Sequence, residues 1–288
     1  MNSTMPKASL AVFLVTILVV FGPGPSMSEP PGDLKGRELA LAVDSRTGNV
    51  MPDIGSLTPE ESGRQWKLEL NYSPGMEITV AITGTGTSEV TFDSRVQEQS
   101  FQTMIKANCV IKEVLDDGDT LMEITTLEFS GPVSPSEMGL PSVGQTIRKL
   151  LDKLGNIKIV EGASGPGNYT KSDLVFPAHS VSRGEKWSTR LQLEIAELPI
   201  DLDIVYIMAG ETVLDGRQCL KIDVKQKAFF QNNEMSIRVE DTGAIYLDPV
   251  VMCQVLVENE SVSFLENYSK AVKVKGVSRT KATFTIKR

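Results

Sequence analysis

The chain has 288 residues, of which 41% are hydrophobic, and a formal net charge of −8 at neutral pH. Its length is enough to bury a substantial core, either as one large β domain or as two smaller halves. The acidic balance excludes nucleic-acid binding by general electrostatic attraction, and the single histidine argues against a zinc site.

Residues 1–28 have the features of a cleaved secretory signal. Lys7 precedes an apolar stretch, residues 10–22, and the small-residue sequence Ser26-Met27-Ser28 follows. A membrane anchor is the competing interpretation, but a span needs about 20 apolar residues, and a glycine and two prolines end this stretch early. We therefore expect a secreted or periplasmic protein with no transmembrane span in the mature chain, which begins near Glu29.

Residues 29–62 are rich in Gly, Pro, Ser and charge and contain no aromatic residue. This composition predicts a flexible N-terminal segment that proteases trim up to about Gly63.

Alternation of apolar and polar residues predicts a mainly β protein, with a first β-rich half at 63–136 and a second at 184–288. In residues 65–72 it places Trp66, Leu68, Leu70 and Tyr72 on one face, and in residues 201–208 Leu202, Ile204, Tyr206 and Met208. Residues 186–195 place Trp187, Thr189, Leu191, Leu193 and Ile195 on one face, and residues 282–286 place Ala282, Phe284 and Ile286. Residues 250–257, apolar on both faces, predict a central strand. The pattern is that of antiparallel sheets with one dry face.

A different spacing interrupts the strands in the predicted connector, residues 137–161. Val143, Ile147, Leu150, Leu151 and Leu154 fall on one helical face. Ser142 and Gln145 have capping-box spacing, and Gly155 is a suitable C-terminal residue. The pattern predicts one amphipathic helix near 142–154 that covers a face of the sheet.

The two strand-rich halves resemble each other. Residues 114–124 and 213–222 each have the pattern of two strands around an Asp-Gly turn, and glycine turns with Gly75 and Gly184 precede a strand in each half. A degenerate duplication explains this, and chance recurrence of common hairpin residues is the alternative.

Residues 162–183 form the predicted loop that precedes the second half. In 162–173, "GASGPGNYTKSD", Asn168 stands where a phosphate loop needs lysine, and Pro166 stands where a nucleophile elbow needs glycine. The only histidine, His179, lies before a turn and is expected to be a loop residue. We find no catalytic, cofactor or metal site and do not expect an enzyme, although acidic pairs of the glycoside-hydrolase type stay open.

Three further groups of residues have structural explanations. Asp116, Asp117, Asp119 and Glu123 span too few positions for a helix-loop-helix calcium site, so an ordinary hairpin turn is expected. Cys109, Cys219 and Cys253 lie in apolar runs as buried thiols, with one disulfide among an undetermined pair as the alternative. Asn71, Asn168, Asn259 and Asn267 stand in sequons, which are glycan acceptors in a eukaryotic secretory route and mean little in a bacterium.

Residues 176–188, "FPAHSVSRGEKWS", followed by a hairpin and "VEDTGAIYLD", resemble uncharacterised bacterial secreted and lipoprotein families. The matching positions are Val181, Gly184, Trp187 and Ser188, in a V-x-x-G-x-x-W-S pattern, and the resemblance covers residues 140–288. It implies a cell-envelope β fold similar to the half-open barrels of lipoprotein carriers, and no activity. The lipid-bearing cysteine of the lipoprotein members is absent.

Two functional hypotheses follow. The first is a non-catalytic interaction module of the cell envelope, whose partner is an envelope protein or a polysaccharide. The second is a binder or carrier of a lipid or other apolar ligand in a curved-sheet groove. Residues 270–288 carry seven basic residues and no acid. These are either the solvated faces of terminal strands or a basic strip for anionic lipid or polysaccharide.

Overall fold

The computed structural model describes residues 63–92, 95–132, 135, 140–162, 174–195, 198–269 and 271–287. In this part of the chain every regular element is a β-strand. The predicted signal peptide (1–28), the predicted flexible segment (29–62) and residues 163–173, with Asn168, lie outside the described residues.

Two consecutive meanders make one sheet of eleven strands. The first contains β2 (Glu77–Phe92), β3 (Arg95–Val114), β4 (Thr120–Ser130), β5 (Thr146–Leu151) and β6 (Ile157–Glu161). The second contains β8 (Lys186–Ile195), β9 (Leu198–Leu214), β10 (Arg217–Gln231), β11 (Met235–Leu247), β12 (Gln254–Asn267) and β13 (Val272–Lys287). Pairing of β2 with β13 joins them in the order β6-β5-β4-β3-β2-β13-β12-β11-β10-β9-β8. Every neighbouring pair is antiparallel, and β6 and β8 are open edges, so the mainly β, antiparallel prediction is confirmed.

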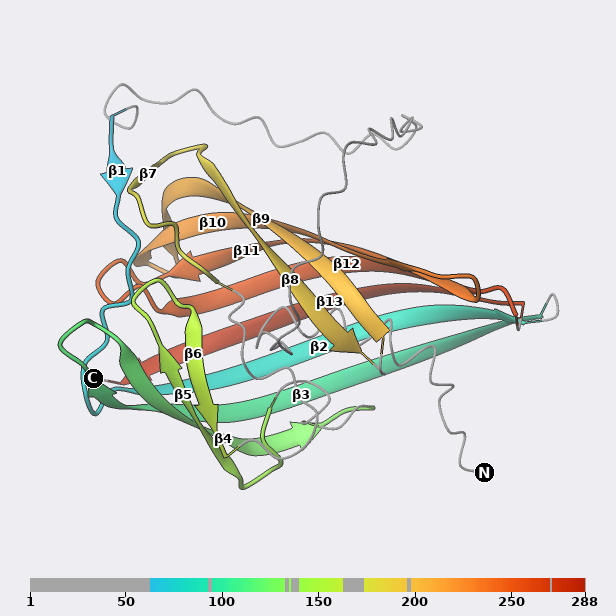
Figure 1. Ribbon diagram of the computed structural model, residues 1–288, viewed down its shortest axis with the longest axis horizontal. Coiled ribbons are helices and arrows are strands. Elements are labelled where there is room, and N and C mark those ends of the chain that lie inside the picture. The colour runs from blue at the N-terminus through green and yellow to red at the C-terminus, as the bar shows by residue number, and fades with distance from the viewer. Residues whose placement is uncertain are drawn as a thin grey trace, which may run out of the picture.

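The sheet is strongly curved (Figure 1). The long strands β2, β3 and β10 to β13 converge toward one end, which we call the tip end; it holds the β2–β3 and β12–β13 hairpins. The opposite, wider end is called the base end. It holds a second, small sheet of β1 (Gln65–Trp66) and β7 (Val181–Ser182).

Side chains alternate between a buried inner face and an exposed outer face. In β2, Ile78, Val80 and Ile82 are buried, while the threonines and glutamates between and beyond them face outward. The residues predicted to share the dry face of 201–208 are all buried in β9, and Trp187 and Ala282 also pack on the core. The period-two pattern therefore identified the inner face correctly.

The predicted central strand at 250–257 begins later than expected. Val250 is exposed and Met252 has a positive φ of 53° in the turn before β12, which starts at Gln254. Only Val255, Leu256 and Val257 are buried on both faces, so the double-sided burial is limited to the first part of the strand.

The predicted helix near 142–154 is wrong. Residues 146–151 form β5, which pairs with β4 on one side and β6 on the other, so the predicted connector is part of the sheet. Ile147 and Leu151 face the core, as expected of alternate strand positions. Ser142, expected to cap a helix, instead starts a turn in which the Gln145 amide donates to the Ser142 carbonyl at 2.8 Å.

This turn occurs three times, each time just before a strand. Its glycines, Gly75, Gly144 and Gly184, have φ of 84°, 80° and 81°, a conformation that glycine adopts without steric cost. Each glycine amide donates to a carbonyl of an adjacent strand: to Ile111 in β3, Thr126 in β4 and Met208 in β9. Both predicted glycine turns are therefore confirmed, and a third one replaces the helix start.

The predicted hairpins at 114–124 and 213–222 are also present, as β3–β4 and β9–β10. The second has the tight turn expected of Asp-Gly, with φ of 49° at Asp215 and 80° at Gly216. A common origin of the two halves stays a prediction.

Candidate binding site

An extended segment without regular structure, residues 67–76, crosses the base end; we call it the base strap. Its Leu70 amide donates to the Lys153 carbonyl in the β5–β6 turn at 2.8 Å. Its Asn71 amide donates to the Val251 carbonyl in the β11–β12 turn at 3.1 Å. The base strap therefore ties the two meanders together. Alternation persists along it, because Leu68 is fully buried while Lys67 and Glu69 form an ion pair outside.

An apolar pocket of about 150 Å³ lies between the base strap and the inner face. Leu70 and Tyr72 of the strap, Ile78 and Val80 of β2, and Met122 and Ile124 of β4 line it. We call it the base pocket. Drug-sized ligands occupy about 300–1,000 Å³, whereas an apolar cavity of about 150 Å³ accepts benzene. The base pocket is thus large enough for one end of an apolar ligand.

The base pocket also contains a few polar groups. Burial raises the pKa of the Cys109 and Cys253 thiols to about 12, and Lys149 of β5 only partly opposes this at Cys109. Burial raises the pKa of Tyr72 as well, and its hydroxyl lies within hydrogen-bonding reach of Cys253. Tyr72 and both thiols are therefore neutral at physiological pH and offer no reactive thiolate, while the buried Lys149 also lines the pocket.

Between the base pocket and a buried apolar row near the tip end, which contains Val90, Val274, Leu265 and Ile237, the inner face is polar. One row of paired positions runs Gln226, Asp241, Ser261, Ser278 and Gly86 across β10, β11, β12, β13 and β2. Adjacent rows contribute further polar side chains. We call the whole set the inner polar belt: Ser88, Gln99, Thr103, Gln226, Asp241, Asn259, Ser261, Ser263, Ser278 and Thr280.

Glycines make room within the belt. Asn259 lies directly over Gly243 of the neighbouring strand, since a Cβ on Gly243 would stand 1.8 Å from Asn259 Oδ1. The half-buried ring of Phe101 lies over Gly86 in the same way, at 2.2 Å from the position of such a Cβ. The belt is therefore a surface of hydroxyl, amide and carboxyl groups with an aromatic ring beside it.

Many polar atoms of the belt are buried without a hydrogen-bond partner among the described residues. They include the hydroxyls of Ser88, Thr103 and Thr280, the Asn259 amide nitrogen and both carboxyl oxygens of Asp241. Each such atom costs about 1–3 kcal/mol if it stays unsatisfied, and native interiors contain few of them. A row of them on one face is therefore unusual for a purely structural core.

Asp241 is the most perturbed acid of the belt. Burial raises its pKa to about 8, so it is mostly protonated at neutral pH and both donates and accepts hydrogen bonds. The nearby Thr242 amide opposes this rise in the pKa, although it makes no well-formed hydrogen bond with either carboxyl oxygen. The inner-face positions paired with Asp241, which are Gln226 and Ser261, are uncharged.

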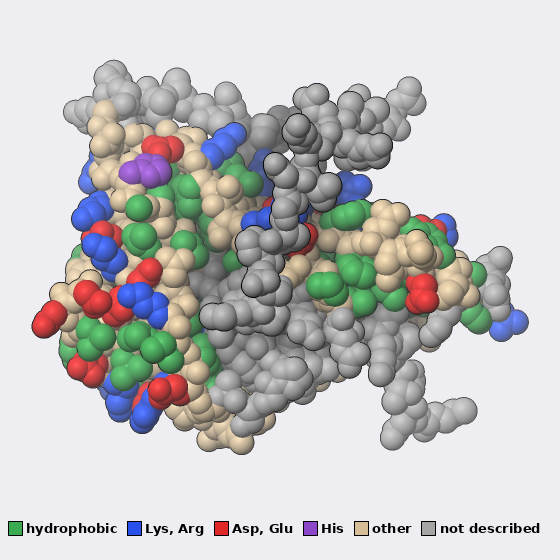
Figure 2. All heavy atoms as spheres, in the orientation of Figure 1, with side chains coloured by type: hydrophobic (Ala, Val, Ile, Leu, Met, Phe, Trp, Pro, Cys, Tyr) green, Lys and Arg blue, Asp and Glu red, His purple; other side chains and the backbone are tan. Residues whose placement is uncertain are grey.

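The outer face of β13 carries the predicted basic strip, but acids of neighbouring strands neutralise much of it. Lys273, Arg279 and Lys281 form ion pairs with Glu266, Glu260 and Glu258 of β12 at 2.6–2.9 Å. At the base end, Figure 2 likewise shows acidic and basic side chains next to one another. The interpretation as solvated strand faces is therefore the better of the two.

Nearer the tip end, the outer face has a shallow groove of about 540 Å³. Phe229, Phe264 and Tyr268 line it and are about half exposed, at 56%, 46% and 47%. Arg238 of β11 lies between Phe229 and Phe264 in the strand pairing. We call this the outer aromatic groove, a feature that sequence patterns missed because single aromatic residues on outer strand positions gave no signal.

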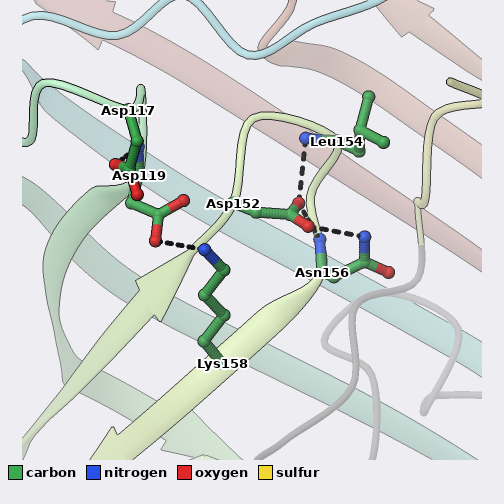
Figure 3. Close-up of polar contacts among 6 residues, drawn as sticks. All are labelled: Asp117, Asp119, Asp152, Leu154, Asn156 and Lys158. Carbon is green, nitrogen blue, oxygen red and sulfur yellow. Dashed lines mark hydrogen bonds and ion pairs between the residues drawn. The ribbon is translucent and has the colours of Figure 1, made fainter.

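The acids considered for calcium have other partners (Figure 3). Asp117 accepts the Asp119 amide at 3.0 Å within the β3–β4 turn, and Asp119 forms an ion pair with Lys158 of β6. Glu123 binds Arg148 and Lys112 at 2.9 and 3.3 Å. In the next turn Asp152 accepts the amides of Leu154 and Asn156. The part of the chain that the structure describes contains no group of three or more His, Cys, Asp or Glu residues arranged for a metal ion.

His179 is an exposed loop residue, as expected, and its Nε2 lies 2.8 Å from Glu185 Oε1. Three of the four residues of the V-x-x-G-x-x-W-S pattern have structural roles. Val181 is fully buried in β7, and Gly184 makes the turn into β8. Trp187 stacks on Tyr206 at 5.3 Å, and its Nε1 donates to the Val175 carbonyl at 2.9 Å. The pattern thus marks a packing motif.

All three cysteines are free and buried, and Cys109 and Cys253 line the base pocket together. Of the described sequons, Asn71 is exposed, whereas Asn259 is 4% exposed and points into the belt. A glycan on Asn259 is therefore incompatible with this fold. Across the described ranges we find no helix with the length and hydrophobicity needed to cross a bilayer.

No protein-family model and no curated protein matches the chain. Among solved structures, the attachment invasion locus protein Ail of Yersinia pestis is 11% identical and covers 74% of this chain and 100% of its own, with a TM-score of 0.19. A DUF1329 family protein from Desulfovibrio piger is 11% identical and covers 72% of this chain and 85% of its own, with a TM-score of 0.13. The COG4313 outer membrane channel of Pseudomonas putida is 9% identical and covers 75% of this chain and 97% of its own, with a TM-score of 0.18. TM-scores this low carry no argument about this chain.

Proposed function

We propose that the protein is a non-catalytic, secreted or periplasmic binding protein of the cell envelope that holds a lipid or other apolar ligand on the inner face of its curved sheet. The base pocket is the observation that carries this proposal. Its lining is mainly apolar, and it lies between the base strap and the strands, where side chains of both meanders meet. The secretory signal predicted at residues 1–28 supports the location.

The absence of a catalytic role is part of the same proposal. Its support is that His179 contacts a glutamate at the surface, while burial raises the pKa of the pocket thiols and keeps them unreactive.

Native mass spectrometry of protein purified from its own host, followed by displacement of a fluorescent fatty acid, tests the proposal. We expect co-purifying lipid and saturable displacement. Val80→Phe fills the base pocket and should weaken probe binding, whereas Ala81→Phe, its outward-facing neighbour, should not. A ligand-free monomer that binds no fatty-acid probe would refute the proposal.

A second candidate function is favoured by the outer aromatic groove. Exposed aromatic rings beside Arg238 and Lys275 suit stacking on a polysaccharide of the envelope, and this would make the protein an interaction module. Phe264→Ala should then abolish retention on immobilised cell-wall polysaccharide, while Val262→Ala on the same strand should not. Equal retention of both variants would exclude the groove.

A further inference from the structure

The inner polar belt is a second chemical environment on the face that holds the base pocket. Val80 of the pocket lies on the same strand as Gly84 and Gly86, which pair with Thr280 and Ser278 of the belt and stand four and six residues from Val80. At about 3.3 Å per residue this corresponds to roughly 13–20 Å. An amphiphile of ordinary length therefore reaches from one environment to the other.

We propose that the inner polar belt binds the neutral, hydroxyl-rich headgroup, a sugar or a polyol, of the apolar ligand whose tail enters the base pocket. This inference rests on the proposed function for the tail and adds the identity of the headgroup.

The unsatisfied groups of the belt point to a ligand that both donates and accepts hydrogen bonds. The buried Asn259 amide nitrogen donates, the Gln226 amide oxygen accepts, and the hydroxyls of Thr103 and Thr280 do either. These side chains are at least nine-tenths buried and project from four different strands onto the same face. Hydroxyl groups of a sugar satisfy all of them.

The composition of the belt selects against anionic headgroups. None of its ten residues is a lysine, arginine or histidine, so a phosphate or sulfate would be buried without a counterion. The ring of Phe101 over Gly86 adds an apolar surface that suits the C–H face of a sugar.

Binding of three amphiphiles with the same octyl chain tests the proposal: octyl glucoside, octyltrimethylammonium and octyl sulfate. Calorimetry below their critical micelle concentrations should show roughly tenfold tighter binding of the glucoside. Asp241→Leu should remove most of this preference, and Glu240→Gln, on the outward side of the same strand, should preserve it.

The outcomes separate the two proposals. Equal binding of the three amphiphiles, or tighter binding of either ionic one, overturns the headgroup assignment and leaves the tail site intact. Failure of all three to bind refutes the tail site together with the headgroup assignment. Because Asp241→Leu can also impair folding, Asn259→Leu serves as the second variant. If both variants fold and still prefer the glucoside, the belt holds only water and the headgroup assignment is overturned.

Discussion

Asp241→Asn should stabilise the protein by an amount that grows with pH. The carboxyl has a pKa of about 8 in the fold, against an ordinary value of 3.8, because it is buried on the inner face. Between these values the folded protein holds a proton that the unfolded chain has lost. Folding then takes up a proton, and the free energy of unfolding falls as pH rises.

The size of the effect follows from proton linkage. The slope is about 1.4 kcal/mol per pH unit, so the wild type should lose about 4 kcal/mol between pH 5 and pH 8. The contribution of protonated Asp241 to the free energy of unfolding is complete below pH 3.8 and is lost as the pH rises through about 8. Asparagine resembles the protonated acid and has no such dependence. Other perturbed carboxyls, including Glu123 and Asp248, have pKa values below their ordinary ones, so their contributions change only at lower pH.

Urea unfolding at pH 5, 6, 7 and 8, followed by tryptophan fluorescence, measures the difference between the two proteins. We expect the advantage of the variant to rise steadily over this range. Glu240→Gln, on the opposite face of β11, is the control and should track the wild type over the same range. Parallel curves for Asp241→Asn and the wild type would refute the reasoning, because they would show that Asp241 is ionised and solvated in the fold.

Three further predictions concern glycines and thiols. Gly243→Ala should destabilise the protein by about 1–3 kcal/mol in urea unfolding, because its Cβ would meet Asn259 Oδ1 at 1.8 Å. Gly84→Ala, whose Cβ would meet nothing nearer than 3.7 Å, should cost less, and equal costs would contradict the close packing at Gly243. Gly144→Ala should destabilise by about 1 kcal/mol because φ is 80°, while a stabilising effect would support the helix that the structure replaces with a turn. Cys109 and Cys253 should react with Ellman's reagent only after unfolding, since burial raises both pKa values to about 12, and rapid native reaction would contradict their burial.

Much of the sheet was predictable because one face of most strands is dry. From Leu202 to Met208, apolar residues alternate with the residues between them without interruption, so only one face of the strand can be the buried one. The structure confirms that these apolar residues are buried. The helix at 142–154 failed because the Ser142 and Gln145 spacing imitates a capping box. The same Ser-x-Gly turn precedes β2 and β8, and comparison of Gly144 with Gly75 and Gly184 would have indicated a strand.

The inner polar belt could not be predicted for a physical reason. Residues 83–88 of β2 are small or polar on both faces, so the sequence does not tell which side is buried. Only the register of the strands brings these positions together. It places Gly86 opposite Ser278, Ser278 opposite Ser261, and Ser261 opposite Asp241. The base pocket escaped prediction similarly, because the base strap meets β4 and the β11–β12 turn across long separations in the chain.

The glycines of the belt link its packing to its proposed role. An apolar inner face would stabilise the sheet more, since each buried and unsatisfied polar atom costs about 1–3 kcal/mol. Gly243 and Gly86 also give up side-chain contacts in the centre of long strands, where glycine is unfavourable. Both costs fall on the same rows of the sheet. The glycines make room for the Asn259 side chain and the Phe101 ring, and hydroxyl groups of a bound ligand would offset the cost of the unsatisfied polar atoms. A stability gain on octyl glucoside binding that Asp241→Leu abolishes would join the two observations, whereas a gain unchanged in that variant would separate them.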